Sequence, residues 1–107
     1  MSNFTILGTY TDLALKGFIN NPTQDRKAIV EKMSASVGAS LLDFRLTRGN
    51  FDFVATVEGS MHQVLALKLA VLSTGAIGEM HILEELDISG PAALAAKALQ
   101  EYAPPQS

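Results

Sequence analysis

Residues 41–59, LLDFRLTRGNFDFVATVEG, decide the fold, because they read as two β-strands that fold back on each other. Apolar and polar residues alternate along both arms, and such alternation, rich in aromatic and β-branched residues, is typical of half-buried strands. Gly49 and Asn50 suit a two-residue type II′ turn, which fixes the register of the hairpin. The residues expected to share the apolar face are Leu42, Phe44, Leu46, Phe51, Phe53, Ala55 and Val57.

The opposite face of this hairpin is mostly polar. It carries Asp43, Arg45, Thr47, Asp52, Val54 and Thr56. In the expected register Arg45 lies diagonal to Asp52, within reach of a long side chain. One interpretation is a ligand-binding pocket, with an anion held by Arg45 and oriented by Thr47, and Asp52 as a base or acceptor. The alternative is a structural ion pair across the strands, or a device that gives a dimer its specificity.

The composition indicates a single domain, residues 1–107. The net charge of −3 and the scattered positions of the eight Lys and Arg residues argue against a nucleic-acid partner. The absence of cysteine excludes disulfides and thiolate ligands, and no motif predicts a cofactor. Neither a signal-peptide pattern nor an apolar run long enough to span a bilayer is present, so we expect a cytoplasmic protein with no membrane partner.

The remaining segments supply the other strands and helices. Pro22 breaks the first crossover into two helical segments. Ser60 and Gln63 have the spacing of a capping box, and Pro91 suits the first position of a last helix. Besides the hairpin, the expected elements are strands at 3–10 and 77–86 and helices at 13–19, 24–37, 60–73 and 90–103.

The order β-α-β-β-α-β-α predicts an α+β, ferredoxin-like βαββαβ core at residues 3–87 with an extra C-terminal helix at 90–103. One face of its four-stranded sheet is bare in a monomer. Leu7, Val54, Leu83 and Ile77 are the apolar residues expected on that face. The helix at 60–73 is apolar all round, so we expect the C-terminal helix or a second subunit to cover its back. Both features predict a homodimer or higher homo-oligomer.

His81 is the more interesting of the two histidines. It lies in the middle of a predicted strand, two residues after Glu79, so both side chains project from the open face. A histidine there could transfer protons or bind a ligand, but one histidine beside glutamates is too few ligands for a metal. The alternative is a hydrogen-bonded histidine at an interface. Tyr10 could donate a proton at a pocket mouth, or simply pack at the edge of the core.

Residues 46–58, LTRGNFDFVATVE, resemble the signature of the GYD-domain family, small bacterial proteins named for a Gly-Tyr-Asp motif. Gly49 and Asp52 match that motif, and Phe51 stands where the family usually has tyrosine. The first strand with its ending at residues 8–11, Gly38 and the apolar helix extend the likeness over residues 4–86. The resemblance implies a ferredoxin-like domain similar to the dimeric α/β-barrel group, in which two sheets pack face to face. It implies no established chemistry.

Three functions follow as hypotheses. The first is a homodimeric small-molecule-binding or interaction module, with a ligand near Tyr10, Arg45, Thr47, Asp52, Glu79 and His81. The second is a cofactor-free enzyme of the dimeric barrel type, an isomerase or oxygenase, with Asp52 or His81 as the acid or base. The third is a structural subunit of a larger assembly that uses the C-terminal helix as an extra contact. We choose the first.

Overall fold

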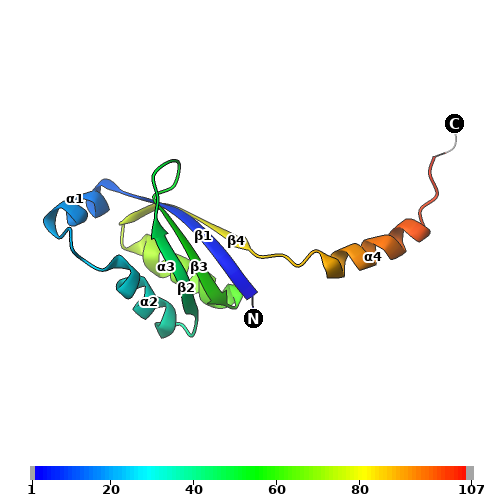
Figure 1. Cartoon of the computed structure of the whole chain (residues 1–107), viewed down its shortest axis with the longest axis horizontal. Helices are drawn as coiled ribbons and strands as arrows, with labels where there is room; N and C mark the ends of the chain where they lie inside the picture. The colour runs from blue at the N-terminus through cyan, green and yellow to red at the C-terminus, as the bar shows by residue number, and fades with distance from the viewer. Residues whose placement is uncertain (1, 106–107) are drawn as a thin grey trace.

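The computed structural model describes residues 2–105 and contains one antiparallel sheet in the order β2-β3-β1-β4. Helices α2 and α3 lie on the same face of this sheet (Figure 1). The elements are β1 (Ser2–Tyr10), α1 (Asp12–Asn20), α2 (Arg26–Ser36), β2 (Ser40–Leu46), β3 (Phe53–Gly59), α3 (Met61–Ser73), β4 (Ile77–Glu84) and α4 (Ser89–Gln100). The predicted α+β fold with ferredoxin-like strand order and an extra C-terminal helix is confirmed.

The core lies where the two central strands meet the helices. Phe4 and Ile6 of β1 are buried and pair with Val57 and Ala55 of β3, as period-two alternation requires. Gly8 lies on the same face of β1, and a side chain there would collide with the ring of Phe53. Glycine at this position therefore allows the Phe53 ring to lie directly against the backbone of β1.

The hairpin has the predicted register but a different end. Thr47 N–H donates to Asp52 O at 2.9 Å, as expected for opposed residues. The tight type II′ turn is wrong in detail, because Gly49 has φ of +143°, whereas that turn needs a value of about +60°. Phe51 was predicted on the core face, and its ring instead meets that of His81 edge-on, with centroids 5.4 Å apart. Since β3 begins only at Phe53, strand alternation does not fix the direction of Phe51.

A β-bulge changes which residues of β2 face the core. The register shifts between Leu41 and Asp43, so Leu41 pairs with Val57 and packs against the core. Leu42, predicted on the apolar face, is 51% exposed. The alternation of the sequence is compatible with either leucine facing inward, and the inserted residue selects Leu41.

A second irregularity corrects the prediction for β4. The pairing of β1 with β4 shifts between Gly8 and Tyr10, and Ile77 pairs with Tyr10 and is buried in the core. The prediction that Ile77 faces outward on the open face is therefore wrong. The predicted strand at 77–86 is also too long, because β4 ends at Glu84 and Leu86 is exposed beyond it.

The helix starts follow their capping residues. Asp25 caps α2 by accepting a hydrogen bond from Ala28 N–H at 3.1 Å. The predicted capping box of α3 is confirmed, since Ser60 and Gln63 each accept a backbone N–H of the other. Only one side of α3 is buried, and Leu65 and Leu69 on its back are exposed.

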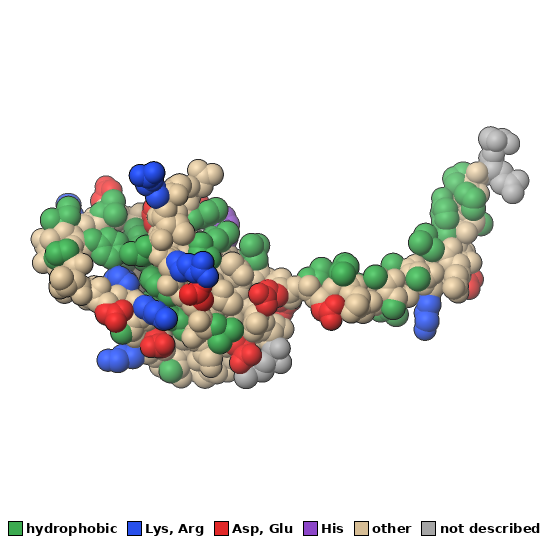
Figure 2. Space-filling view, in the orientation of Figure 1, with side chains coloured by type: hydrophobic (Ala, Val, Ile, Leu, Met, Phe, Trp, Pro, Cys, Tyr) green, Lys and Arg blue, Asp and Glu red, His purple; other side chains and the backbone are tan. Residues whose placement is uncertain are grey.

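Helix α4 stands away from the sheet at the end of an extended segment (Figure 1), and every residue of it is exposed. The chain accordingly has a radius of gyration of 19.0 Å, against about 13 Å for a compact chain of this length. Figure 2 shows apolar side chains along this arm. In this structure α4 therefore does not cover the back of α3, and the grouping of residues 1–107 into one domain stays a prediction.

Candidate functional site

The polar cluster predicted on the hairpin is not assembled. Arg45 keeps the expected register opposite Val54, but its Nε pairs with Asp43 Oδ2 of its own strand at 2.7 Å rather than with Asp52. Thr47 donates its hydroxyl to Phe51 O at 2.6 Å. The Arg45–Asp43 pair is well exposed, and such pairs contribute about 0–1 kcal/mol. The role of Arg45 and Thr47 in ligand binding stays a prediction.

Asp52 belongs to the hairpin loop and lies next to the last residues of β1. Its Oδ2 accepts a hydrogen bond from Tyr10 N–H at 2.8 Å, and its own N–H donates to Gly8 O at 2.8 Å. These two bonds join the hairpin loop to the last residues of the central strand. The geometry therefore gives Asp52 a structural role, and its role as a base stays a prediction.

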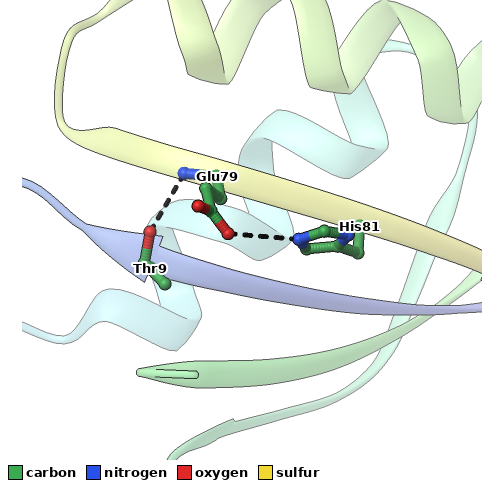
Figure 3. A network of polar contacts seen from close by, with 3 residues as sticks. All are labelled: Thr9, Glu79 and His81. Carbon is green, nitrogen blue, oxygen red and sulfur yellow. Dashed lines mark hydrogen bonds and ion pairs between the residues drawn. The ribbon is translucent and has the colours of Figure 1, made fainter. Parts of the chain in front are cut away.

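Glu79 and His81 lie side by side on the open face, as predicted (Figure 3). His81 Nε2 is 3.3 Å from Glu79 Oε2, and Thr9 Oγ1 accepts a hydrogen bond from Glu79 N–H at 3.0 Å. Phe51 packs against the His81 ring. Within residues 2–105, no hydrogen bond joins His81 to Asp52, and no three His, Asp or Glu side chains are close enough to hold a metal ion.

A cavity lies on the other face of the sheet, under the helices. It has a volume of about 310 Å³, and we call it the chamber. Its walls are formed by Ile6, Phe53 and Ala55 of the sheet, Val30 and Met33 of α2, and Leu67 and Val71 of α3. Small-molecule sites are typically concave and mostly apolar, with volumes of roughly 300–1,000 Å³. The chamber falls within that range.

Tyr10 and Arg26 form the polar end of the chamber. The Tyr10 ring packs against Phe18 and Phe53, with centroids 4.9 and 5.3 Å away. Arg26 also lines a second cavity of about 80 Å³ beside α1, so it stands where the two cavities adjoin. The Arg26 Nε atom is buried and has no hydrogen-bond partner among the described residues.

Burial raises the pKa of the Tyr10 phenol above its usual value of 10.0. The positive charge of Arg26 lowers that pKa, and the negative charge of Asp52 raises it, but burial has the largest effect. Tyr10 is therefore neutral at pH 7, and Arg26 supplies the charge at this end of the chamber.

Of the site residues predicted from the sequence, only Tyr10 lines the chamber, and Arg26, which also lines it, is not among them. A signal was present, because Arg26 lies three, four and seven residues before Ile29, Val30 and Met33. Residues at that spacing share one face of a helix. An arginine on the apolar face of α2 therefore pointed toward the core side.

No helix within residues 2–105 is long and apolar enough to cross a membrane.

Comparisons with known proteins give a family and several remote structural likenesses. No curated protein matches the sequence significantly. The crystal structure of FFRP-DM1 is similar at 14% identity and a TM-score of 0.48, over 80% of this chain and 100% of that one. A hypothetical protein from Pyrococcus horikoshii is similar at 11% identity and a TM-score of 0.49, over 81% of this chain and 92% of that one. The family model of the GYD domain matches residues 4–89, so the chain belongs to the GYD-domain family.

Proposed function

We propose that this protein is a small-molecule-binding module that holds a largely apolar ligand in the chamber. The observation that carries the proposal is an apolar cavity of about 310 Å³ between the sheet and α2 and α3. The cavity is partly open, so without a ligand its apolar walls face water instead of packing against other apolar groups. A bound apolar molecule would replace the missing contacts.

The test compares octanol binding to the wild type and to two tryptophan variants by titration calorimetry. Val30 lines the chamber, so Val30→Trp places a large side chain in it. Glu31 is the next residue of α2 and is exposed, so Glu31→Trp is the matched control. We expect octanol to bind the wild type and Glu31→Trp alike, and Val30→Trp to bind at least about tenfold more weakly.

Two outcomes contradict the proposal. One is a folded wild type that takes up no octanol. The other is a folded Val30→Trp variant that binds octanol as well as the Glu31→Trp control does, which would place octanol outside the chamber.

The module is proposed to work as a homodimer that associates through the open face of the sheet. Leu7 and Val54 lie next to each other on that face as a register pair, and Leu83 beside them is 54% exposed. The face also carries both signs of charge, including Arg45 and Glu79, which suits the self-complementary interface of a twofold dimer. We expect Val54→Lys to dissociate the dimer in sedimentation velocity, whereas Leu69→Lys on the back of α3 leaves it intact. A monomeric wild type would contradict this association.

A structural subunit of a larger assembly is the second candidate, and the exposed α4 is the observation that favours it. An isolated helix of this length is marginal in water, so an alanine-rich helix without contacts to its own domain suits packing against a neighbour. Removal of residues 87–107 would then lower the mass of the particle in solution to that of a dimer or monomer. The same state of association before and after removal would contradict this candidate.

A further inference from the structure

The polar groups that line the chamber are satisfied within the chain, with one exception. Ser34 donates its hydroxyl to Val30 O at 2.8 Å. Thr74 donates to Val71 O at 2.7 Å and accepts from Ala76 N–H at 3.1 Å. Neither hydroxyl therefore has a free O–H to donate to a ligand. The exception is the end at which Arg26 and Tyr10 lie.

The guanidinium of Arg26 lies against Gln24 and Phe18, and it is close enough to the Tyr10 phenol to lower the pKa of that group. Its Nη1 donates to Gln24 Oε1 at 3.1 Å, and its Cζ lies 5.7 Å from the centre of the Phe18 ring. These contacts leave the Nε atom buried without an acceptor. Arg26 also forms no ion pair with a carboxylate within residues 2–105. Arg26 is only partly buried, but its Nε donor lies out of contact with solvent and lacks an acceptor, and a buried donor without a partner is unfavourable.

We infer that the ligand of the chamber is an apolar molecule that ends in a carboxylate, and that this carboxylate binds the Nε edge of Arg26. The inference rests on the proposed function, because it names the class of ligand for the same chamber. A carboxylate matches the planar guanidinium and can accept two parallel N–H bonds from one edge. It would supply both the missing acceptor for Nε and the missing negative charge.

The surrounding groups favour a carboxylate over other polar ends. The Tyr10 phenol is neutral and adds no charge, and the Asp52 carboxylate is engaged by the backbone N–H of Tyr10. A single arginine then compensates one negative charge, which suits a monocarboxylate better than a doubly charged phosphate. A cationic ligand would be repelled, and a neutral ligand would leave the Arg26 charge uncompensated.

The test compares octanoate with octanol, two probes with the same apolar chain and different ends, by titration calorimetry. Four proteins are compared: the wild type, Arg26→Gln, Arg26→Lys and the control Lys27→Gln. Lys27 is the next residue of α2 and is exposed, so Lys27→Gln removes the same charge away from the chamber. We expect octanoate to bind the wild type at least about tenfold more tightly than octanol, as for hydrogen bonds to a charged group.

In Arg26→Gln the two probes should bind equally, through loss of octanoate affinity with little change for octanol. Arg26→Lys should keep part of the preference for octanoate, because lysine keeps the positive charge but lacks the planar guanidinium that can donate two parallel hydrogen bonds. Lys27→Gln should resemble the wild type. Circular dichroism and thermal melts establish that each variant is folded.

Failure of the inference differs from failure of the proposed function. If octanol binds the wild type as tightly as octanoate, or if Arg26→Gln keeps the preference for octanoate, the carboxylate inference is overturned and the chamber remains a binding site. If neither probe binds the folded wild type, both are overturned. If Lys27→Gln loses the preference as fully as Arg26→Gln, the effect is one of net charge and the assignment to Arg26 is overturned.

Discussion

The carboxylate of Asp52 accepts a hydrogen bond from the backbone N–H of Tyr10 at 2.8 Å and so ties the hairpin loop to the end of the central strand. Both residues are only partly exposed. Removal of the acceptor in Asp52→Ala leaves the Tyr10 N–H without its partner. We expect a loss of about 1–3 kcal/mol in the free energy of unfolding, measured by urea denaturation.

Asp43→Ala is the matched control for that loss, because Asp43 is in an exposed pair with Arg45. We expect it to change the free energy of unfolding by less than about 1 kcal/mol. An equal loss in the two variants would contradict the special role given to Asp52.

A second prediction concerns two glycines in opposite surroundings. A side chain at Gly8 would collide with Phe53, whereas a side chain at Gly17 in α1 meets nothing within 4 Å. We expect Gly8→Ala to destabilise the protein by about 1–3 kcal/mol and Gly17→Ala to stabilise it by up to about 1 kcal/mol. Chemical denaturation of both variants measures the difference, and an unchanged Gly8→Ala variant would contradict the close packing of Phe53 on β1.

The capping box of α3 gives a third prediction. The Ser60 hydroxyl accepts Gln63 N–H at 3.1 Å, so Ser60→Ala should lower the free energy of unfolding by about 1 kcal/mol. Ser73, in the last turn of the same helix, only donates to Ala70 O. Ser73→Ala should therefore change the free energy of unfolding by less than about 0.5 kcal/mol. A larger loss in Ser73→Ala than in Ser60→Ala would contradict the stabilising role of the capping box.

The pH dependence of stability gives a fourth prediction. Burial raises the pKa of Tyr10 above 10.0 in the folded state, so the folded protein holds this proton more tightly than the unfolded chain does. The resulting stability is fully present below pH 10 and is lost as the pH rises through the raised pKa. In urea denaturation between pH 8 and pH 11, the free energy of unfolding should fall more steeply with pH for the wild type than for Tyr10→Phe. The same dependence of the free energy of unfolding on pH in both proteins would contradict burial of the phenol.

The core strands and the start of α3 can be predicted from the sequence. The prediction fails where a bulge inserts one residue into a strand, and where a loop departs from strand geometry. Phe53, Ala55 and Val57 alternate without interruption, so their shared buried face follows from period two. The bulge at β2 does not follow, because Leu41 and Leu42 are equally apolar. Phe51 precedes the first residue of β3, so extending the alternation back to it wrongly predicts that it faces the core.

The binding chamber was harder to predict than the fold. The polar residues of the hairpin suggest a site on the open face, whereas the chamber lies under the helices and is mostly apolar. Apolar cavity walls have the same sequence pattern as a filled core, so Val30 and Leu67 carried no distinguishing signal. Arg26, a charged residue on the apolar side of α2, departs from that pattern.

The most direct test of the central claim is to locate a bound ligand. Nuclear Overhauser effects from octanol to methyl-labelled Ile, Leu and Val side chains report which groups lie next to it. We predict effects to Ile6, Val30 and Val71, which line the chamber. Effects confined to Leu7 and Leu83 would instead place the ligand on the open face of the sheet and contradict the account.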